Sequence, residues 1–591
     1  MTKQKPSRLN LPEALNGPFG GVVIGTYGVD IDFLEAHLLR RMPRHLSSRV
    51  ILADAMQLHT TLTSGIKPRK ANRSYVLAPV TTSHAFHPKF ILLTGPTHGR
   101  LLVGSGNATV GGYIGPGEAF TTYDYSPEAT GHIREFAGLE RFLRILQEES
   151  GLDAMAWRII EDQLQQAPWI HDHPQGSTVI HNRNESHLSQ LKARIGDHKV
   201  LEVIAYAPFH DRKAQALQDI LQSLQPDTLT LLAQQHQTTL DTAATTRAVA
   251  SAGDKFRAFS IEAPDPYERA YLHAKFILVR TARADHLLQG SANLSSVALS
   301  RSGTDANVEL CNLLTAKPGE FDGFIHAIDW TPLAADLADL ESAPWSDPTP
   351  KPSELGLIRN VCWLPPHLTG ICSQTITPKD INVRVAGKQV HPSSTELEHV
   401  PEGTNFTLTF ETRDVEAINS APHLTIAIAG HEPTEVYPYW VNDLLRMSST
   451  GSRIDLLRDI GGDNLNDKEI MDLLQVLDHV LILDMRSAWK LAHPQQPTES
   501  EHEGDSPRLS YEDIDWELVR QHSAYKAFTG HRLRHDTSPT ELAILLDSLA
   551  ERFRLDASGQ GATSAGIDDF RHEQESEDAD VLDEESSDDE T

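Results

Sequence analysis

Residues 87–107 have the sequence HPKFILLTGPTHGRLLVGSGN, and residues 273–293 have the sequence HAKFILVRTARADHLLQGSAN. The two stretches align without a gap when 186 is added to the numbering of the first. Each contains two apolar runs that are typical of neighbouring β-strands. An internal repeat of this kind predicts that the supersecondary structure around it is also repeated.

The segments that precede the two stretches follow the same order of expected elements. An apolar run at residues 22–27 is followed by Asp30, a plausible N-cap, and then by a periodic helical pattern. A second apolar run at residues 203–206 is followed by an amphipathic stretch at residues 214–224. The sequence therefore predicts an α/β fold made of two repeated halves that form a pseudo-dimer within one chain, at residues 15–165 and 195–335.

The chain changes character after a Pro-rich stretch at residues 346–352, which reads as a linker. Strand-like alternation then predicts a β-rich, sandwich-like domain at residues 355–440. The pattern becomes helical at residues 441–556, so we expect a helical C-terminal region there. Residues 557–591 are predicted to be a disordered acidic tail, because Asp568 to Glu590 contain 13 acidic residues and a single arginine.

The charge of the chain is distributed unevenly. The whole sequence has a formal net charge of -30, but residues 1–330 contain 32 basic and 33 acidic residues, so nearly all of the excess lies after them. The first part is therefore compatible with a polyanionic partner such as nucleic acid, while the acidic C-terminal half is a possible docking region for a basic protein partner.

Three cysteines without a Cys-x-x-Cys pair favour a reducing compartment, and no apolar run is long enough to predict a signal or a membrane span. We expect a cytoplasmic protein.

The repeated stretches carry side chains suited to phosphoryl transfer. A histidine and a lysine at positions i and i+2 of a strand project from the same face, and the asparagine follows at the end of the next strand. Lysines supply fixed positive charge, asparagines and the adjacent hydroxyls of Ser105 and Ser291 supply hydrogen bonds to phosphate oxygens, and histidines act near neutral pH as nucleophile or acid. The predicted catalytic set is His87, Lys89, Asn107, His273, Lys275 and Asn293.

These residues resemble the paired HKD motifs of the phospholipase D superfamily over roughly residues 15–330. The resemblance implies a metal-independent phosphodiesterase that works through a phosphohistidine, with His87 as the nucleophile and His273 as the general acid, and without a cofactor. It also implies an acidic residue after each asparagine that orients the imidazole, for which Glu118 and Glu309 are candidates at unequal offsets. The third residue of the family motif, an aspartate, is replaced here by Thr94 and Arg280.

The superfamily resemblance does not choose the substrate, because related folds act on nucleic acids and on lipids. Residues 1–100 contain 13 basic and 5 acidic residues, and four of the basic ones cluster just before the first motif: Lys67, Arg69, Lys70 and Arg73. Such a surface is typical of nucleic-acid binding, so our first hypothesis is a nuclease that acts on DNA or RNA. The alternatives are a phospholipase D or phosphatidyl-transfer activity on lipids, and a catalytically silent scaffold in a larger assembly.

Overall fold

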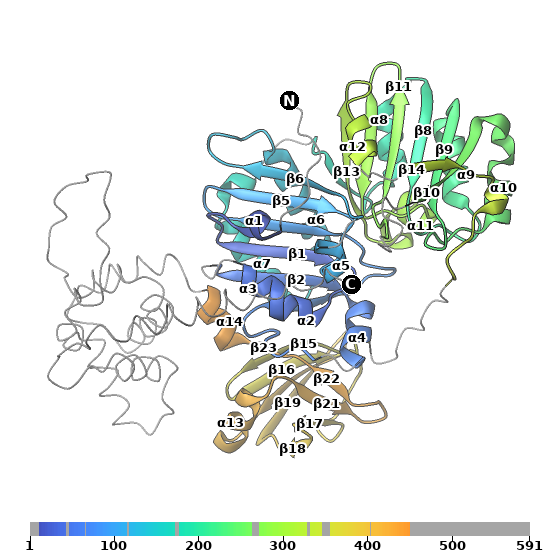
Figure 1. The fold of residues 1–591 in the computed structure, drawn as a ribbon. Coiled ribbons are helices and arrows are strands. Elements are labelled where there is room, and N and C mark those ends of the chain that lie inside the picture. The colour runs from blue at the N-terminus through green and yellow to red at the C-terminus, as the bar shows by residue number, and fades with distance from the viewer. Residues whose placement is uncertain are drawn as a thin grey trace, which may run out of the picture. The chain divides into compact units, whose positions relative to one another are not determined.

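The computed structural model describes residues 11–42, 46–64, 67–114, 117–171, 176–262, 271–327, 331–345, 355–401 and 403–448. These residues form a mixed α/β structure with four β-sheets (Figure 1). The predicted helical region at 441–556 lies outside them except for α14 (Val441–Ser448), and the predicted acidic tail at 557–591 lies wholly outside them.

The first sheet has six strands in the order β3-β2-β1-β4-β5-β6. The strands β1, β2 and β3 pair in parallel, whereas β4, β5 and β6 join in antiparallel pairs beside β1. Strands such as β1 and β4 are buried on both faces, which explains their continuous apolar sequences. The strands are β1 (Gly21–Thr26), β2 (Ser48–Asp54), β3 (Val76–Val80), β4 (Phe90–Thr94), β5 (Gly99–Gly104) and β6 (Phe120–Tyr125).

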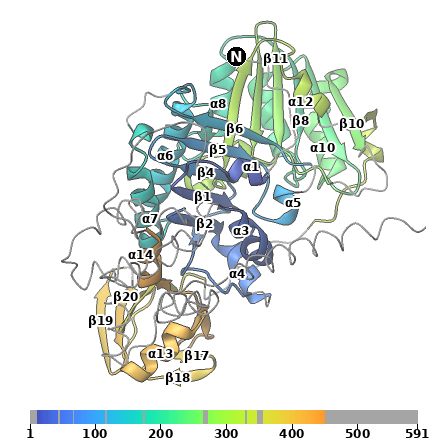
Figure 2. The ribbon, with the colours of Figure 1, turned by 60° about the vertical axis from the view of Figure 1, so that its left-hand side comes forward.

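Helices cover both faces of the first sheet (Figure 2). One face packs against α6 (Ile133–Glu148), α7 (Ala154–Gln165) and η2 (Pro168–Ile170). The opposite face carries short elements: α1 (Leu11–Leu15), α2 (Ile31–Phe33), η1 (Leu34–Leu38), α3 (Leu39–Arg41), α4 (Ala55–Thr63) and α5 (Val110–Tyr113). Asp30 caps α2 as the sequence predicts, since its carboxylate accepts a hydrogen bond from the Phe33 amide at 3.0 Å.

The second sheet has the order β14-β10-β9-β8-β11-β12-β13-β7. Its six inner strands repeat the order and directions of the first sheet, because β8, β9 and β10 pair in parallel and β11, β12 and β13 follow in antiparallel pairs. The strands are β7 (Val179–His181), β8 (Val200–Tyr206), β9 (Thr228–Gln234), β10 (Phe256–Glu262), β11 (Phe276–Thr281), β12 (Asp285–Gly290), β13 (Leu310–Ala316) and β14 (Thr331–Ala334).

The helices of this part pack mainly on one face of the second sheet, where α8, α9 and α10 share a core with its strands. α12 contributes to the core on the opposite face. The elements are α8 (His187–Ile195), α9 (Gln215–Leu224), α10 (Thr242–Val249), η3 (Ala250–Lys255), α11 (Ser296–Leu299), η4 (Gly303–Asp305), α12 (Asp322–Ala327) and η5 (Leu337–Asp339).

The β-rich part consists of two sheets that share one apolar core around Trp363 and Phe406. The first sheet contains β15 (Ile358–Leu364), β16 (His367–Cys372), β19 (Ser394–Val400), β20 (Gly403–Thr409) and β23 (Tyr439–Trp440). The second contains β17 (Ile381–Val385), β18 (Lys388–Val390), β21 (Leu424–Ile428) and β22 (Thr434–Val436). A helix that the sequence analysis did not anticipate, α13 (Thr412–Ser420), interrupts the strands.

The basic cluster before the first motif joins the first half to the β-rich part. The Arg73 guanidinium lies 3.5 Å from the centre of the Trp440 ring, pairs with Asp443 at 2.7 Å, and donates to the carbonyls of Asn419 and Ala421. The Lys67 ammonium pairs with Glu435.

Two of the four residues that the sequence predicts to bind substrate have partners from distant sequence. Arg73 is partly buried against Trp440, whereas Lys67 is exposed beside Glu435. Arg69 and Lys70 are also exposed. Substrate binding by this cluster stays a prediction.

Candidate active site

The two His-x-Lys pairs lead directly into equivalent strands, β4 and β11. In each pair the lysine Nζ donates to the carbonyl of its own histidine, from Lys89 to His87 at 2.7 Å and from Lys275 to His273 at 2.5 Å. Both lysines are almost completely buried. A buried ammonium with a single carbonyl partner retains hydrogen-bond donors, and these suit an anionic ligand.

Backbone pairing brings each asparagine motif to its lysine. The amide of Gly104 donates to the Lys89 carbonyl at 3.0 Å, and that of Gly290 donates to the Lys275 carbonyl at 3.3 Å. The segments Ser105–Asn107 and Ser291–Asn293 therefore begin beside the lysines, as the spacing in the sequence predicts.

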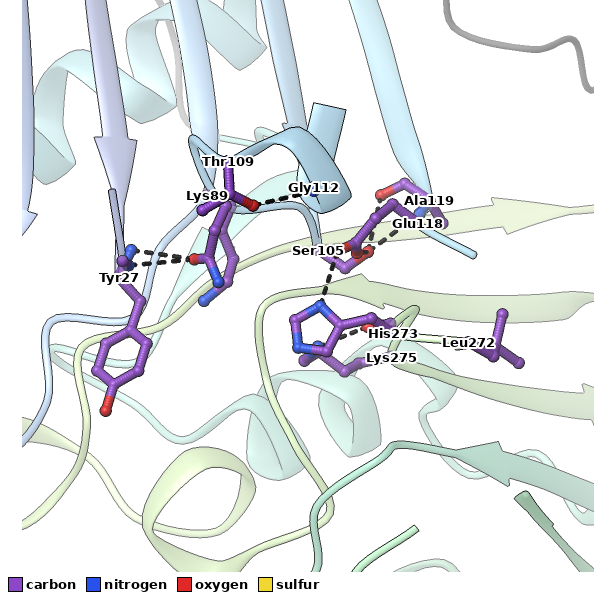
Figure 3. Close-up of polar contacts among 12 residues, drawn as sticks. Tyr27, Lys89, Ser105, Thr109, Gly112, Glu118, Ala119, Leu272, His273 and Lys275 are labelled. Atoms are coloured by element: carbon purple, nitrogen blue, oxygen red, sulfur yellow. Dashed lines mark hydrogen bonds and ion pairs between the residues drawn. The ribbon is translucent and has the colours of Figure 1, made fainter. Parts of the chain in front are cut away.

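Each histidine is paired with a glutamate of the opposite half. His87 Nδ1 lies 2.9 Å from Glu309 Oε2, and His273 Nδ1 lies 2.7 Å from Glu118 Oε1. Figure 3 shows His273 turned toward Glu118, with Lys275 beside it and Lys89 reaching in from the first half. The two crossed pairs show that each half completes the other's histidine.

The backbone also crosses between the halves at these points. The His87 amide donates to the Val308 carbonyl at 2.9 Å, and the His273 amide donates to the Gly117 carbonyl at 2.8 Å. In both cases the acceptor is the residue just before the glutamate. Gly117 has φ +94°, and a Cβ there would lie 2.2 Å from the Tyr271 carbonyl oxygen, so this crossing requires glycine.

The unequal offsets of the two glutamates have a local cause. Each glutamate comes just before the equivalent strand, Glu118 before β6 and Glu309 before β13. The second half has five more residues between its asparagine and its glutamate, and the 3₁₀ turn η4 lies in this longer connection. The two glutamates therefore occupy equivalent positions in space, although their distances in sequence from Asn107 and Asn293 differ.

A buried polar interface joins the strands next to the motifs. The Tyr123 hydroxyl donates to Asn312 Oδ1 at 2.9 Å, and the Asn312 amide donates to the Val103 carbonyl at 3.1 Å. Gln289 accepts from the Thr121 hydroxyl and donates to the Ala119 carbonyl at 2.8 Å. Because these groups are paired with one another rather than with water, the two halves have a defined register at the site.

Burial and neighbouring charges set the protonation of the histidine pairs. Burial lowers the pKa of His87, and burial together with the charge of Lys275 lowers the pKa of His273 to about 4. Burial alone raises the pKa of Glu118 and Glu309, but their histidine partners bring both pKa values below the usual range. Each pair is therefore a carboxylate that accepts the Nδ1 hydrogen of a neutral imidazole, which leaves the Nε2 lone pair available.

The lysines are held in an environment that favours loss of charge until an anion binds. Burial lowers the pKa of Lys275 to about 8. Burial and the nearby charge of Lys275 lower the pKa of Lys89 well below its usual value. An anion that bound between them would raise both pKa values, because opposite charge favours the charged form of each lysine.

The serines of the Gly-Ser-x-Asn motifs have a different partner from the one predicted. The Ser105 hydroxyl donates to Glu118, and the Ser291 hydroxyl donates to Glu309. Both serines are fully buried. Because a hydroxyl has one hydrogen to donate, these serines hold the glutamates and do not contact a phosphate in this conformation.

Thr94 and Arg280, which stand where the HKD motif has its aspartate, lie away from the two His–Glu pairs. Thr94 and Arg280 come five positions after the lysines, which on an extended strand is roughly 16 Å. Thr94 accepts a hydrogen bond from Gln163 at 2.9 Å, and Arg280 pairs with Asp322 at 2.8 Å. Both side chains contribute to packing at the far ends of β4 and β11.

The aromatic residues beside the histidines were not identified from the sequence, and one of them is Tyr271, whose ring centre lies 5.6 Å from that of His273. The Tyr27 ring lies edge-to-face with His87, with ring centres 4.9 Å apart, and the Phe209 ring lies edge-to-face with His273 at 6.2 Å. Tyr27 and Phe209 follow the first strands of their halves, β1 and β8. The sequence does contain an aromatic residue at the end of the first apolar run and another three positions after the second. Neither can be linked to a histidine until the fold places the end of the run next to a distant motif.

Within the described residues, no cluster of three or more histidine, cysteine, aspartate or glutamate side chains is arranged to hold a metal ion. None of the helices in this part of the chain has the length and apolar character to cross a bilayer.

No family model matches this sequence, and no curated protein matches it. Solved structures with partial similarity include yeast tyrosyl-DNA phosphodiesterase, with 11% identity and a TM-score of 0.35 over 52% of this chain and 86% of that one. Phosphatidylserine synthase of Haemophilus influenzae has 10% identity and a TM-score of 0.34 over 56% of this chain and 86% of that one. Polyphosphate kinase of Porphyromonas gingivalis has 13% identity and a TM-score of 0.32 over 58% and 49%. These scores are too low to assign a function, so a functional argument has to rest on the site itself.

Proposed function

We propose that the chain is a phosphodiesterase of the phospholipase D type, with one composite active site formed by two halves that act as a pseudo-dimer, and that its substrate is a nucleic acid. The observation that carries this proposal is the crossed pairing of His87 with Glu309 and of His273 with Glu118. Two oriented imidazoles and two buried lysines are the groups that a phosphoryl transfer through a phosphohistidine needs.

In the first step His87 Nε2 attacks phosphorus. The P–N bond forms and the bond to the leaving oxygen breaks, while that oxygen takes a proton from His273 Nε2. Glu309 stabilises the positive charge that develops on His87 by accepting its Nδ1 hydrogen bond. His273 must be protonated for this step, and the negative charge of a bound phosphodiester beside it raises its pKa from the low value of the free site.

In the second step water attacks the phosphohistidine. His273, now neutral, takes a proton from the water as the new P–O bond forms and the P–N bond breaks. His87 is released as neutral imidazole and His273 is protonated again, so the cycle closes. The charge on the phosphate oxygens is balanced by Lys89 and Lys275, a role that divalent metals have in other phosphoryl-transfer sites.

Nucleic acid is favoured over other phosphodiesters by the charge of the first part of the chain. Residues 1–100 contain 13 basic and 5 acidic residues, and three of the clustered ones, Lys67, Arg69 and Lys70, are exposed. A phospholipid is the second candidate. It is favoured by two exposed apolar side chains, Val110 and Ile114, at the two ends of α5, just after Asn107.

The test is incubation of the full chain with single-stranded DNA, RNA, duplex DNA and phosphatidylcholine vesicles, each in excess EDTA and in Mg²⁺. We expect cleavage of a nucleic acid at equal rates in both buffers. Acid-quenched mass spectrometry after mixing with an activated aryl phosphodiester should locate a phosphoryl adduct on His87. Activity that depends on Mg²⁺, or an adduct on another residue, contradicts this mechanism, and cleavage of the vesicles alone selects the second candidate.

A further inference from the structure

Phe209 is an exposed aromatic residue beside the histidine that acts as the acid. It follows β8, and 43% of its surface is exposed although it is a large apolar side chain. Its ring centre lies 6.2 Å from that of His273, with the ring planes at 77°. A single exposed phenylalanine is common on proteins, but one that borders a catalytic imidazole contacts whatever binds there.

The backbone on both sides of Phe209 is fixed. The Thr239 amide donates to the Pro208 carbonyl at 2.8 Å, and the His210 amide donates back to the Thr239 carbonyl at 3.2 Å. Asp211 then accepts from the Gln215 amide at 2.6 Å and caps α9. Because its neighbours are held on both sides, the backbone of Phe209 has a defined position beside His273.

The equivalent position in the first half is Gly28. The short bridges Val29–Ala108 and His210–Leu294 pair equivalent residues, so Gly28 and Phe209 both come just before the bridge. A Cβ added at Gly28 meets no atom within 4 Å. The position of Phe209 is therefore a glycine in the first half, where the ring beside His87 is that of Tyr27 instead.

We propose that Phe209 is the platform on which the base of the leaving nucleotide stacks when single-stranded nucleic acid is cleaved. The inference rests on the proposed function, in which His273 protonates the leaving oxygen, so the group next to Phe209 is the leaving group. A flat apolar face suits a nucleobase, and a base that is not already stacked in a duplex is available to it.

The charge near Phe209 distinguishes this ligand from a lipid headgroup. An aromatic ring also attracts a quaternary ammonium group such as choline. However, the next residues of the loop are the exposed Arg212, whose guanidinium lies over the Trp345 ring, and the exposed Lys213. Two cationic residues in the segment that follows Phe209 disfavour a cationic headgroup and favour the phosphate of a nucleic-acid strand.

The experiment uses dinucleoside monophosphates, which contain one phosphodiester each. Three substrates are compared: thymidylyl-thymidine, and the same molecule with the base removed from the 5′ or from the 3′ nucleoside. The enzymes are the wild type, Phe209→Ala, Phe209→Trp, and Leu364→Ala as a control that truncates another exposed apolar side chain, on β15.

We expect Phe209→Ala to lower kcat/KM on the intact substrate by about 5- to 100-fold, which corresponds to the loss of one stacked base. Phe209→Trp should retain activity, and Leu364→Ala should match the wild type. On one of the two abasic substrates, the one that lacks the leaving base, wild type and Phe209→Ala should become equal.

Equal rates for Phe209→Ala and wild type on the intact substrate overturn this inference and leave the phosphodiesterase proposal standing. The same is true if the Phe209→Ala defect persists on both abasic substrates. If the wild type cleaves phosphatidylcholine and no nucleic acid, the nuclease proposal fails first, and the stacking inference fails with it.

Discussion

The two halves of the site share their reacting groups and differ in what surrounds them. Each half contributes a histidine, a lysine, an asparagine and a glutamate, and the hydrogen bonds of the His–Glu pairs are the same on both sides. The asparagines differ. Asn107 Oδ1 accepts from the amides of Tyr27 at 3.3 Å and Gly28 at 3.4 Å, whereas Asn293 Oδ1 is buried with no partner among the described residues.

The cause of this difference lies in the preceding strand–loop junction. The bridges beside the site align Tyr27 with Pro208 and Gly28 with Phe209. Proline has no N–H, so one donor that fixes Asn107 is missing in the second half. The comparison teaches that two parts with the same strand order can present the same few side chains and still differ in how they fix and surround them.

The largest expected effect is on the shared part, the histidines. His87→Ala and His273→Ala should each lower turnover by on the order of 10²–10⁴-fold or more, because one imidazole cannot serve as both nucleophile and acid. The double variant should be no slower than the slower single variant, since the two residues act as a unit. Steady-state rates of the three variants give the answer, and retention of half the activity in either single variant shows two independent sites.

Substitutions at the two glutamates distinguish the role of nucleophile, proposed for His87, from the role of acid, proposed for His273. Glu309→Gln and Glu118→Gln should each lower kcat by about 10²-fold, because the glutamine amide no longer fixes the imidazole tautomer. On an aryl phosphodiester whose leaving group needs no proton, the Glu118 variant should recover the rate of the first step, measured as the burst of aryl product, because Glu118 orients the acid of that step. The second step still needs His273 as a base. The Glu309 variant should not recover. Recovery of both variants, or of neither, removes the distinction between nucleophile and acid.

The asparagines test the asymmetry directly. Asn107→Ala should lower kcat by about 10²-fold, the cost of one fixed hydrogen-bond donor to a developing negative charge. Asn293→Ala should cost clearly less, because its amide is not held by backbone donors and loses rotamer freedom when it binds phosphate. Parallel measurement of kcat and KM for both variants is sufficient, and equal losses mean that the backbone donors of the first half have no catalytic value.

A substitution at Arg73 tests how much the contact between the first half and the β-rich part contributes to stability. The position of Arg73 over Trp440 ties the first half, and not the second, to the β-rich part. Arg73→Ala should lower the free energy of unfolding by about 1–3 kcal/mol, since it removes a cation–π contact and leaves carbonyls unpaired. Arg69→Ala, an exposed neighbour, is the control. Weaker nucleic-acid binding by the Arg73 variant at unchanged thermal stability supports the original prediction that this residue binds substrate.

The smallest expected effect is a dependence of stability on pH that arises from the buried histidines. The pKa of His273 is near 6.5 in the unfolded chain and about 4 in the folded one, so the unfolded chain binds more protons between these values. Stability should therefore fall as pH falls from about 6.5 toward 4. His273→Asn should flatten this slope in thermal melts at several pH values, and an unchanged slope assigns the effect to other groups.

The strands of the six-stranded and eight-stranded sheets could be predicted largely from the sequence, because strands buried on both faces have continuous apolar runs. The runs at 90–93 and 203–206 lie in observed strands, and the run at 22–27 extends one residue past the end of β1. The stretch at 171–189 lies between the two predicted halves, 15–165 and 195–335, so the sequence predicts no element for it. It contains β7 and the start of α8, because β7 is a three-residue edge strand formed by pairing with β13, and so short a strand leaves no pattern of its own.

The sequence by itself determined the set of residues that we propose to be catalytic, because the spacing from histidine to lysine to asparagine is local and is repeated in register. Only the tertiary structure decided how these residues are combined. It paired each histidine with a glutamate of the other half across 155 and 222 positions, directed the serines to those glutamates, and placed Phe209 beside His273. Such contacts depend on how two sheets face each other, and no local pattern along the chain records that.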